Sequence, residues 1–449
     1  MHYKQYKYGI RWNALEAINT QGLLAINQFM LFRVLPLEFY GLTGLIFSLI
    51  YVALPLINLG FDASLPTFIK KYTADKQSFA TLLMPQLYAQ AMTILIATFV
   101  YSFTLITINT VWFSSTQYLQ LSSAFFVLLA GIIITESIKK TLRALTHAYF
   151  LNKQTTLIEL GAVILYTVLV WGNYFMYGTL NLWTIFIPLF IESCFGSLAL
   201  MILIKRTYNM LQAQAKQQEH VSITRIWKNR LSVYVNQLSM IFFSRNFLIL
   251  FLSRQFGLEA IGILKLISEL AIFVLVFIEK LFGTTSGALL AHLKFESLAK
   301  KRIAFTLIAQ QLVSVLSAIL IFLTFNGNMI FCLYCGPISN YYVALVFFFT
   351  IIFENIFLIY ERFALIEEKI FIIILINLLS AGICFPLIVL LQSSLPLSII
   401  IIILTRIVAF IILSFIYYRY WKLPQRIKIL TPFVLVVLLI SLALSYVWR

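Results

Sequence analysis

The sequence LFRVLPLEFYGL at residues 31–42 recurs in altered form at residues 252–263, as LSRQFGLEAIGI. Each residue of the second stretch lies 221 positions after its counterpart (252 against 31), and the identities fall in register without a gap. Over the ten positions from Arg33 to Leu42, the identical pairs are Arg33 and Arg254, Leu37 and Leu258, Glu38 and Glu259, and Gly41 and Gly262. Arginine and glutamate are rare in a chain with 11% charged residues, so the match indicates an internal duplication.

The composition around these stretches is that of a membrane protein. Of the 449 residues, 61% are hydrophobic and 11% are charged, whereas a soluble domain carries about 25% charged residues. This excludes a soluble enzyme, a nucleic-acid-binding module and a disordered chain, and we expect no nucleic-acid partner. The net charge of +17 indicates basic residues gathered in cytoplasmic loops.

Hydropathy predicts thirteen spans of the roughly 20 residues that are needed to cross the hydrocarbon core. They are placed at 12–33, 41–60, 79–108, 119–146, 155–177, 182–204, 231–254, 259–282, 303–325, 341–360, 370–391, 397–418 and 430–448. Six spans separate the two copies of the repeated stretch, so both halves begin on the same side of the membrane, as in transporters built from parallel repeats.

The predicted fold is an all-α polytopic membrane protein. It has two parallel-repeat six-helix bundles around a central cavity, plus an extra C-terminal helix. The predicted boundaries are a first lobe at 1–208, a cytoplasmic inter-lobe linker at 209–228, a second lobe at 229–422 and an additional C-terminal transmembrane helix at 423–449.

The positions of lysine and arginine orient these spans. Basic residues gather in every second connection, whereas the connections 34–40, 109–118, 178–181, 255–258, 326–340 and 392–396 contain no lysine or arginine. Two of the basic groups are Lys139, Lys140, Arg143 and Lys153, and Lys205, Arg206, Lys216, Arg225, Lys228 and Arg230. This pattern places the N-terminus in the cytoplasm, with the first span as a signal anchor.

Polar residues inside the spans must have a partner or a function, since a charge at membrane depth costs at least about 2.5–3.5 kcal/mol on insertion scales. Helical spacing puts two sets on common faces: Asn13, Glu16, Thr20 and Asn27 in the first span, and Asn229, Ser232, Asn236 and Arg254 in the seventh. Lys265 and Glu269 form an i,i+4 pair, and Arg245 points half a turn away from Arg254. These faces are expected to line a wet cavity; hydrogen bonding between helices is the alternative.

Other charges have simpler explanations. Arg33 and Arg254 lie near the outer interface, where snorkelling to lipid headgroups competes with cavity lining. Local pairing is expected for four glutamates that occur singly: Glu136, Glu159, Glu192 and Glu354. The cations Arg33, Arg245, Arg254 and Lys265, set against Glu16 and Glu269, indicate a mildly cationic chamber that suits an anionic, phosphate-bearing ligand.

No pattern in the sequence indicates an enzyme. There is no G-x-S-x-G, P-loop or paired-carboxylate motif, and we expect no catalytic residues and no cofactor. The four histidines lie outside metal-ligand spacings, so no metal is expected either. Cys332 and Cys335 form a C-x-x-C on the outer side, which could be a disulfide or two ordinary apolar residues.

The stretch 32–42, followed by NLGFD at 58–62 and the basic pair Lys70 and Lys71, resembles the opening of polysaccharide flippases of the multidrug/oligosaccharidyl-lipid/polysaccharide exporter superfamily. Those proteins often read R-x-L-G-P-E-x-Y-G-L and then D-L-G. The resemblance implies two six-helix bundles in a V shape, with spans 1, 2, 7 and 8 lining the cavity. Two features depart from the pattern: Leu35 and Pro36 stand in place of Leu-Gly-Pro, and a thirteenth span is predicted.

The resemblance implies an O-antigen flippase-like protein. It would move an undecaprenyl-diphosphate-linked oligosaccharide to the outer leaflet of the bacterial cytoplasmic membrane by alternating access. The substrate-binding candidates are Arg33, Arg245, Arg254, Lys265, Asn27 and Asn236, and the ion-coupling candidates are Glu16 and Glu269. Expected partners are the lipid-linked oligosaccharide, membrane lipids and polysaccharide assembly proteins, with the chain as a monomer.

Two other functions compete with this one. One is a cation-coupled multidrug efflux transporter of the same fold. The other is a membrane glycosyltransferase or polymerase acting on the same lipid carrier, but such enzymes usually carry a large outer loop with charged catalytic residues. The longest predicted outer connection here, 326–340, has no charged residue.

Overall fold

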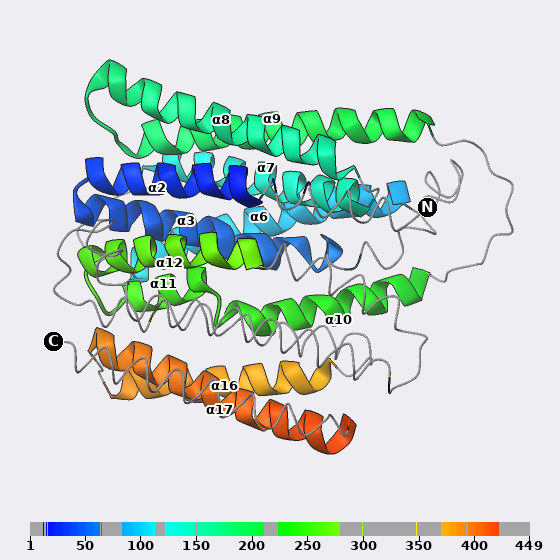
Figure 1. Ribbon diagram of the computed structural model, residues 1–449, viewed down its shortest axis with the longest axis vertical. Coiled ribbons are helices and arrows are strands. Elements are labelled where there is room, and N and C mark those ends of the chain that lie inside the picture. Colours follow the sequence, from blue (N-terminus) through cyan, green and yellow to red (C-terminus); the bar gives the residue numbers. More distant parts are fainter. Residues whose placement is uncertain are drawn as a thin grey trace, which may run out of the picture. The chain divides into compact units, whose positions relative to one another are not determined.

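The structure is a computed structural model that describes residues 17–62, 83–112, 122–148, 151–210, 223–278, 370–391 and 394–421, with a few single positions besides. Every element in these residues is a helix (Figure 1). The helices are η1 (Ala17–Gln21, a π-helix), α2 (Gly22–Val34), α3 (Leu37–Asn58), α6 (Met84–Trp112), α7 (Ser123–Ala148), α8 (Asn152–Tyr177), α9 (Leu182–Met210), α10 (Ile223–Ile241), α11 (Arg245–Ser253), α12 (Leu258–Ile278), α16 (Phe371–Leu390) and α17 (Leu395–Trp421).

The described helices have the length and surface of membrane spans. Six are long and apolar enough to cross a membrane, or up to seven if α10 and α11 form one bent span. Large apolar side chains stay exposed on them, such as Phe99, Val127 and Phe175, which only a lipid environment would favour. The chain is therefore a multi-pass membrane protein. The predicted spans 303–325, 341–360 and 430–448 lie outside the described residues, apart from Phe347.

The chain divides into two compact units. Unit 1 comprises residues Met1–Asn27 and Leu42–Ile241, and unit 2 comprises Gln28–Gly41 and Phe242–Arg449. A short segment of the first repeat thus belongs to unit 2, while α10 belongs to unit 1. The predicted lobe boundaries stay predictions, and most of the predicted linker 209–228 lies outside the described residues.

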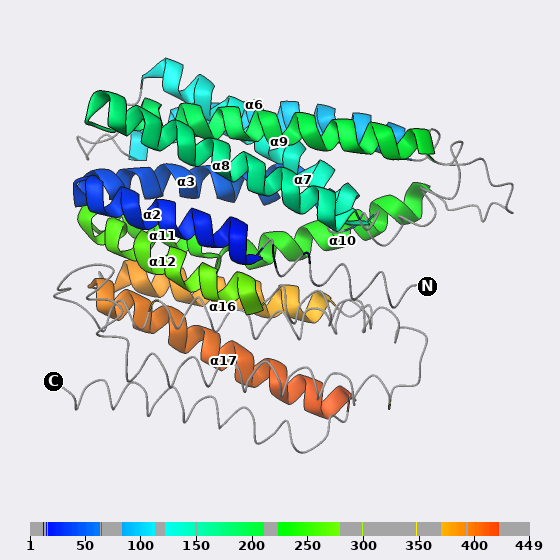
Figure 2. The same ribbon diagram turned by 45° about the horizontal axis from the view of Figure 1, so that its top comes forward.

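In unit 1, α7, α8 and α9 pack alongside one another, and Figure 2 shows α8 and α9 as neighbours from a second direction. The turn between them is the predicted connection 178–181. Gly178 has a positive φ of 70° and donates its N–H to the Tyr174 carbonyl at 2.8 Å, which ends α8. The Asn181 side chain accepts from the Thr184 N–H at 2.9 Å, which caps the start of α9.

The NLGFD motif at 58–62 is anchored inside unit 1 by Arg230 of α10. The Arg230 guanidinium donates to the Leu59 carbonyl at 3.0 Å and to Gln90, and Gln90 donates to the Asn58 side chain at 2.6 Å. A Cβ on Gly60, which has a φ of 70°, would lie 2.8 Å from the Arg230 carbonyl oxygen. Arg230 is buried within α10, so assigning it to a cytoplasmic connection was wrong: its partners, Leu59 and Gln90, are distant in sequence.

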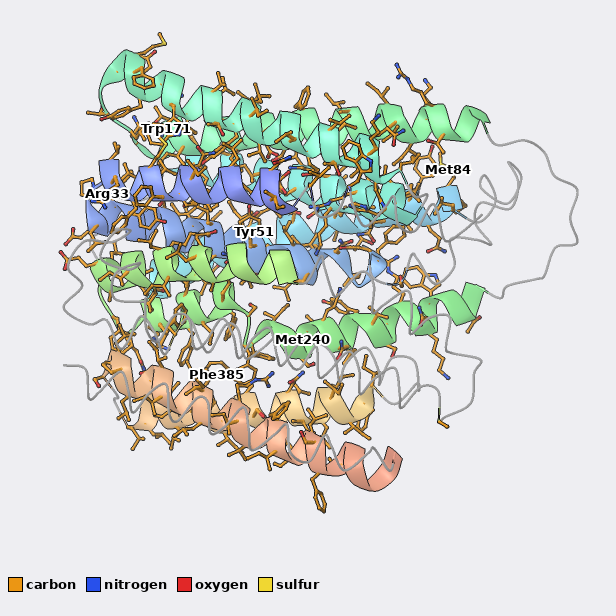
Figure 3. All side chains as sticks on the ribbon, viewed as in Figure 1. Arg33, Tyr51, Met84, Trp171, Met240 and Phe385 are labelled. Atoms are coloured by element: carbon orange, nitrogen blue, oxygen red, sulfur yellow. The ribbon has the colours of Figure 1, made fainter. Side chains whose placement is uncertain are left out.

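In unit 2, an aromatic cluster joins α16 to α11. Phe385 lies on the side of α16 that faces α11 (Figure 3). Its ring centroid is 4.6 Å from that of Phe251, 5.5 Å from that of Phe247 and 5.8 Å from that of Phe243. Each such pair contributes about 0.5–1.5 kcal/mol beyond its buried area, so the cluster holds this part of unit 2 together.

The predicted seventh span at 231–254 is not one continuous helix. It breaks between α10 and α11 with a bend of 47°, and the Ser244 hydroxyl caps α11 by accepting from the Phe247 N–H at 3.3 Å. The expectation that Asn236 and Arg254 share one helical face was therefore wrong, because helical periodicity does not continue through the break. Hydropathy missed the break because it measures composition and not the direction of the backbone.

Candidate functional site

Three charged side chains meet in unit 2, next to the break before α11. Arg245, the first residue of α11, lies 3.0 Å (Nη1) from the Glu269 Oε1 on α12. Lys265, one turn before Glu269, pairs with the same oxygen. Lys265 is 2% exposed, so its ammonium group is held away from lipid and water. The predicted intrahelical pair Lys265–Glu269 is confirmed, and Arg245 joins it from α11.

The break positions this triad, which we define as Arg245, Lys265 and Glu269. Ser244 is the N-cap of α11. The Arg245 side chain therefore projects from the first turn of α11 and reaches Glu269 on α12. One carboxylate between two cations leaves the triad with one positive charge in excess.

Unit 2 holds another buried cation that the sequence analysis missed. Arg406 of α17 is 1% exposed; its Nη1 donates to the Asn377 Oδ1 of α16 at 2.9 Å, and its guanidinium carbon lies 4.1 Å from the centroid of the Phe243 ring. Both contacts stabilise a cation without adding a negative charge. A lone arginine inside the predicted span 397–418 was the available signal.

Arg33 and Arg254, the two arginines of the repeated stretch, are not part of the triad. Arg33 and Arg254 are exposed, at the end of α2 and just after α11. Arg33 lies at the tip of α2 in Figure 3, and its guanidinium carbon is 5.3 Å from the Phe29 ring centroid. Their role in substrate binding stays a prediction.

The two predicted asparagines are buried in unit 1. Asn27 donates to the Thr167 hydroxyl at 2.6 Å and accepts from the Trp171 indole N–H at 3.0 Å, so it ties α2 to α8. Asn236 lies on α10 with its amide nitrogen 3.8 Å from the Met240 sulfur. Binding of substrate by either stays a prediction. The coupling candidate Glu16 lies outside the described residues.

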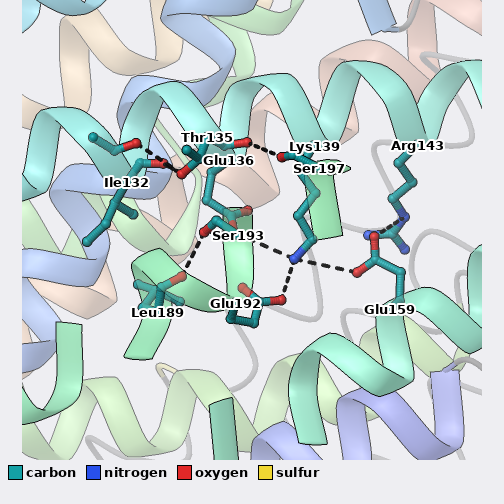
Figure 4. Close-up of polar contacts among 11 residues, drawn as sticks. Ile132, Thr135, Glu136, Lys139, Arg143, Glu159, Leu189, Glu192, Ser193 and Ser197 are labelled. Atoms are coloured by element: carbon teal, nitrogen blue, oxygen red, sulfur yellow. Dashed lines mark hydrogen bonds and ion pairs between the residues drawn. The ribbon is translucent and has the colours of Figure 1, made fainter. Parts of the chain in front are cut away.

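A second charge cluster lies in unit 1, where α7, α8 and α9 meet (Figure 4). The Lys139 Nζ is 2.5 Å from the Glu192 Oε1, 3.6 Å from the Glu136 Oε1 and 3.7 Å from the Glu159 Oε2. Arg143 adds a longer contact to Glu159 at 3.9 Å. We call these five residues the Lys139 cluster. Its two cations and three carboxylates leave one negative charge in excess.

The surroundings of the Lys139 cluster fix its geometry. The Ser193 hydroxyl donates to the Glu136 carboxylate at 2.7 Å. A Cβ on Gly196 of α9 would lie 2.9 Å from the Lys139 Cε, so the missing side chain makes room for the lysine. Nearby, Lys140 pairs with Asp62 at 3.1 Å, and the His147 Nδ1 lies 2.9 Å from the Asn152 side chain.

Sequence reasoning missed the Lys139 cluster. Lys139 and Arg143 were assigned to a cytoplasmic connection, which was wrong, since Lys139 is buried within α7. The three glutamates are paired, as expected, but they share one lysine across three helices. Within the described part of the chain, no group of three or more His, Cys, Asp or Glu side chains is placed to hold a metal ion.

The arrangement was compared with known proteins. No protein-family model matches the sequence, and no curated protein matches it. Among solved structures, the eukaryotic MATE transporter AtDTX14 aligns with 97% of this chain and 100% of its own, at 14% identity and a TM-score of 0.69. The chain has the MATE fold.

Two further solved structures are similar. The MATE transporter ClbM, solved in complex with Rb⁺, is 13% identical over 95% of this chain and 97% of its own, with a TM-score of 0.60. A MOP superfamily transporter from Pyrococcus furiosus, for which reverse polarity of the binding pocket suggests a different function, is 14% identical over 95% and 96%, with a TM-score of 0.56. At these identities the likeness shows the fold.

Proposed function

We propose that this protein is an alternating-access efflux transporter of the MOP superfamily, coupled to a cation gradient, whose cargo is an anionic amphiphile. The MATE fold supports a transporter and favours efflux over lipid-linked oligosaccharide flipping, because the similar structures are MATE transporters. The Pyrococcus furiosus transporter, with its pocket of reverse polarity, supports the idea that this fold accepts cargoes of different charge.

The main support for an anionic cargo is the positive net charge of the triad and Arg406 in unit 2. The triad and Arg406, all among the described residues of unit 2, together contain three cations (Arg245, Lys265 and Arg406) and one carboxylate (Glu269). Cations in a low-dielectric site attract an anion strongly, and arginine binds phosphate or carboxylate through two parallel hydrogen bonds. An anionic headgroup would compete with Glu269 for Arg245, while the apolar tail stays in lipid. A carrier of cationic drugs would need the opposite excess.

We infer that the coupling ion is a proton and that it is held by the Lys139 cluster. One carboxylate in excess at membrane depth is costly unless it is neutralised, and a proton does this without the ligand geometry that a metal ion requires. Glu269 is less suited to this task than the sequence suggested, because two cations hold its carboxylate. Coupling by Glu16 stays a prediction.

The second candidate is the flippase for an undecaprenyl-diphosphate-linked oligosaccharide. The residues at 32–42 and 58–62 favour it, and a diphosphate is an anion that the triad could bind. In that case the lipid-linked oligosaccharide and polysaccharide assembly proteins would be the partners, in the bacterial cytoplasmic membrane.

Transport by purified protein in liposomes tests the proposal. The probes are a fluorescent anionic amphiphile, the cationic dye ethidium and a fluorescent lipid-diphosphate sugar, each with and without an imposed pH gradient. We expect gradient-driven movement of the anionic amphiphile, reduced at least about tenfold by Arg245→Gln with Lys265→Gln, since each lost charged contact contributes about 1.5–3 kcal/mol. Lys205→Gln, at an exposed position on α9, is the control.

The other outcomes are equally informative. Movement of ethidium alone would overturn the anionic cargo. Movement of only the lipid-diphosphate sugar would favour the flippase. Loss of gradient dependence in Glu192→Gln, with a wild-type response in Lys205→Gln, is the result expected if the Lys139 cluster holds the coupling proton.

A further inference from the structure

A stripe of ionisable side chains runs along one face of α7 in unit 1. Its members follow one another at steps of three, four and four residues, which places them one above another on the helix surface. They are Glu136, Lys139, Arg143 and His147, and Figure 4 shows the first three. The stripe begins in the buried Lys139 cluster and ends in the last turn of α7, just past the predicted span 119–146. It therefore connects the cluster with the end of α7 that is predicted to be cytoplasmic.

His147 is held at both of its ring nitrogens. The Arg143 Nε donates to the His147 Nε2 at 3.4 Å, and the His147 Nδ1 lies 2.9 Å from the Asn152 Oδ1 in the first turn of α8. A guanidinium can only donate a hydrogen bond, and an amide oxygen can only accept one. Both contacts are therefore hydrogen bonds when Nδ1 carries the hydrogen and Nε2 carries none, which is the neutral form of His147.

The same Arg143 nitrogen also faces the Lys139 cluster. Its Nε lies 3.9 Å from the Glu159 Oε1. Among the described residues, this oxygen is buried and accepts no hydrogen bond, whereas the carboxylates of Glu136 and Glu192 each accept one. A buried acceptor without a hydrogen bond is costly. A closer approach of Arg143 would therefore stabilise the ionised form of Glu159.

Protonation of His147 would move Arg143 from one of these partners to the other. A proton on the His147 Nε2 turns an acceptor into a donor and adds a like charge, so the contact with Arg143 is lost. The Arg143 side chain is 34% exposed and both contacts are long, so it can shift towards Glu159. There the guanidinium favours the ionised carboxylate. Uptake of a proton by His147 thus favours loss of a proton from the cluster.

The other charged groups around His147 leave Glu159 as the partner for Arg143. On the described parts of α7, α8 and α9, the charged side chains near this end and outside the Lys139 cluster are cations: Lys140, Lys153, Lys205 and Arg206. The helix α6, which also packs on α7, carries no charged residue. Lys140 is already paired, since its Nζ lies 3.1 Å from the Asp62 Oδ2. Glu159 is the carboxylate that Arg143 already contacts, so it is the acceptor for Arg143 when the imidazolium repels it.

We propose that His147 is a positioning residue for proton release from the Lys139 cluster: when it takes up a proton, it moves Arg143 onto Glu159 and keeps that carboxylate ionised. This inference rests on the proposed function, in which the cluster holds the coupling proton. Histidine changes its charge between about pH 5 and 8, so the effect begins when the side on which α7 ends becomes acidic. It sustains proton release under conditions in which mass action alone would slow it.

The pH profile of transport tests this inference with two substitutions at one position. His147→Gln keeps an acceptor for Arg143 but cannot become cationic, whereas His147→Arg is always cationic. Movement of the fluorescent anionic amphiphile by the protein in liposomes is measured while the pH of each compartment in turn is lowered from about 8 to about 6, the range in which histidine titrates. Lys205→Gln, at an exposed position on α9, is the control and should follow the wild type.

The two variants should differ from the wild type in opposite ways. We expect His147→Gln to approach the wild-type rate at the alkaline end, where histidine is neutral too, and to be at least about fivefold slower at the acidic end, since a charged contact is lost. This difference should arise from one compartment only, the one on which α7 ends. His147→Arg should transport at a rate that changes little over the range.

Asn152→Asp shifts the same equilibrium without replacing either His147 or Arg143. A carboxylate beside the His147 Nδ1 favours the imidazolium, so we expect the transition in the transport profile to move by about one unit to higher pH. A histidine that only packs against its neighbours would show no such shift. Thermal unfolding in detergent shows whether each variant folds, and Asn152→Asp remains the test if the variants at position 147 do not.

Two results would overturn the inference. One is a wild-type profile in both variants at position 147. The other is a loss of transport in His147→Gln that is equal at the two ends of the pH range, because a merely structural role would have that effect.

Failure of the proposed function gives a different result. If the wild type moves no amphiphile or ignores the pH gradient, protonation is followed in the purified protein by the infrared band of carboxylic acids, assigned through its loss in Glu159→Gln. We expect the midpoint of this band to lie about one unit lower in pH in His147→Arg than in His147→Gln. That result keeps the inference and rejects the transport proposal. Equal midpoints, or no band that Glu159→Gln removes, would overturn the inference.

Discussion

The two buried charge clusters of this protein have opposite polarity. In unit 1, Lys139 lies among three carboxylates from α7, α8 and α9; in unit 2, Glu269 lies between two cations from α11 and α12. Both obey the rule that a buried charge needs a partner. They differ in net charge, which is negative in the Lys139 cluster and positive in the triad. Pairing explains why such charges are tolerated, whereas the net charge of each cluster indicates what it can bind.

Removal of Lys139, the central lysine of unit 1, is expected to have the largest effect on stability. Lys139→Met leaves three buried carboxylates with Arg143 as the remaining cation of the cluster, and breaking a buried ion pair costs about 3–5 kcal/mol. We expect a large fall in the thermal unfolding temperature of the detergent-solubilised protein. Adding Glu192→Gln should restore part of the loss, because it removes the carboxylate nearest to Lys139. An unchanged unfolding temperature in Lys139→Met would show that the cluster does not stabilise unit 1.

Neutralising the central carboxylate of unit 2 is expected to have a smaller effect. Glu269→Gln removes the negative partner of Arg245 and Lys265 but keeps an oxygen that accepts hydrogen bonds, so we expect a loss of about 2–3 kcal/mol in the free energy of unfolding. Because the positive excess grows, binding of an anionic amphiphile should tighten, as measured by fluorescence titration of the purified protein. Weaker binding of the anion would contradict the assignment of polarity to unit 2.

The smallest expected effect concerns the room left for Lys139. Gly196→Ala places a methyl group 2.9 Å from the Lys139 Cε, which must shift and loosen its contacts. Overpacking of this kind costs about 1–2 kcal/mol. Gly172→Ala is the matched control, since a Cβ there meets nothing within 4 Å, and alanine in a helix is favoured over glycine by about 0.5–1 kcal/mol. Thermal unfolding should therefore move in opposite directions for the two variants; a shared direction would contradict the packing argument.

The helices and the sequence-local contacts could be predicted. A run of about 20 apolar residues has few alternatives in lipid, so the spans from 12–33 to 259–282, and those at 370–391 and 397–418, correspond to helices of the structure. The Lys265–Glu269 pair was also predictable, because both residues lie on one helix at a spacing that brings them together. The duplication was visible because Arg, Leu, Glu and Gly recur at a constant offset.

Contacts between helices could not be predicted from one sequence. Nothing local marks Lys139 as the partner of Glu159 and Glu192, which lie 20 and 53 positions away (159 and 192 against 139). The same holds for Arg406 and Asn377, and for Arg230 and Leu59. The break before α11 was missed because Ser244 acts as a helix cap only in the bent backbone that it helps to form.

The sequence alone was enough to predict that this chain crosses the membrane many times in helices, because lipid solvation and chain periodicity act on neighbouring residues. Which charges meet, and which sign of charge is in excess in each unit, became known only from the tertiary structure. Those properties depend on the packing of helices that are far apart in the chain, and the energy of a buried charge is set by the partners that this packing supplies.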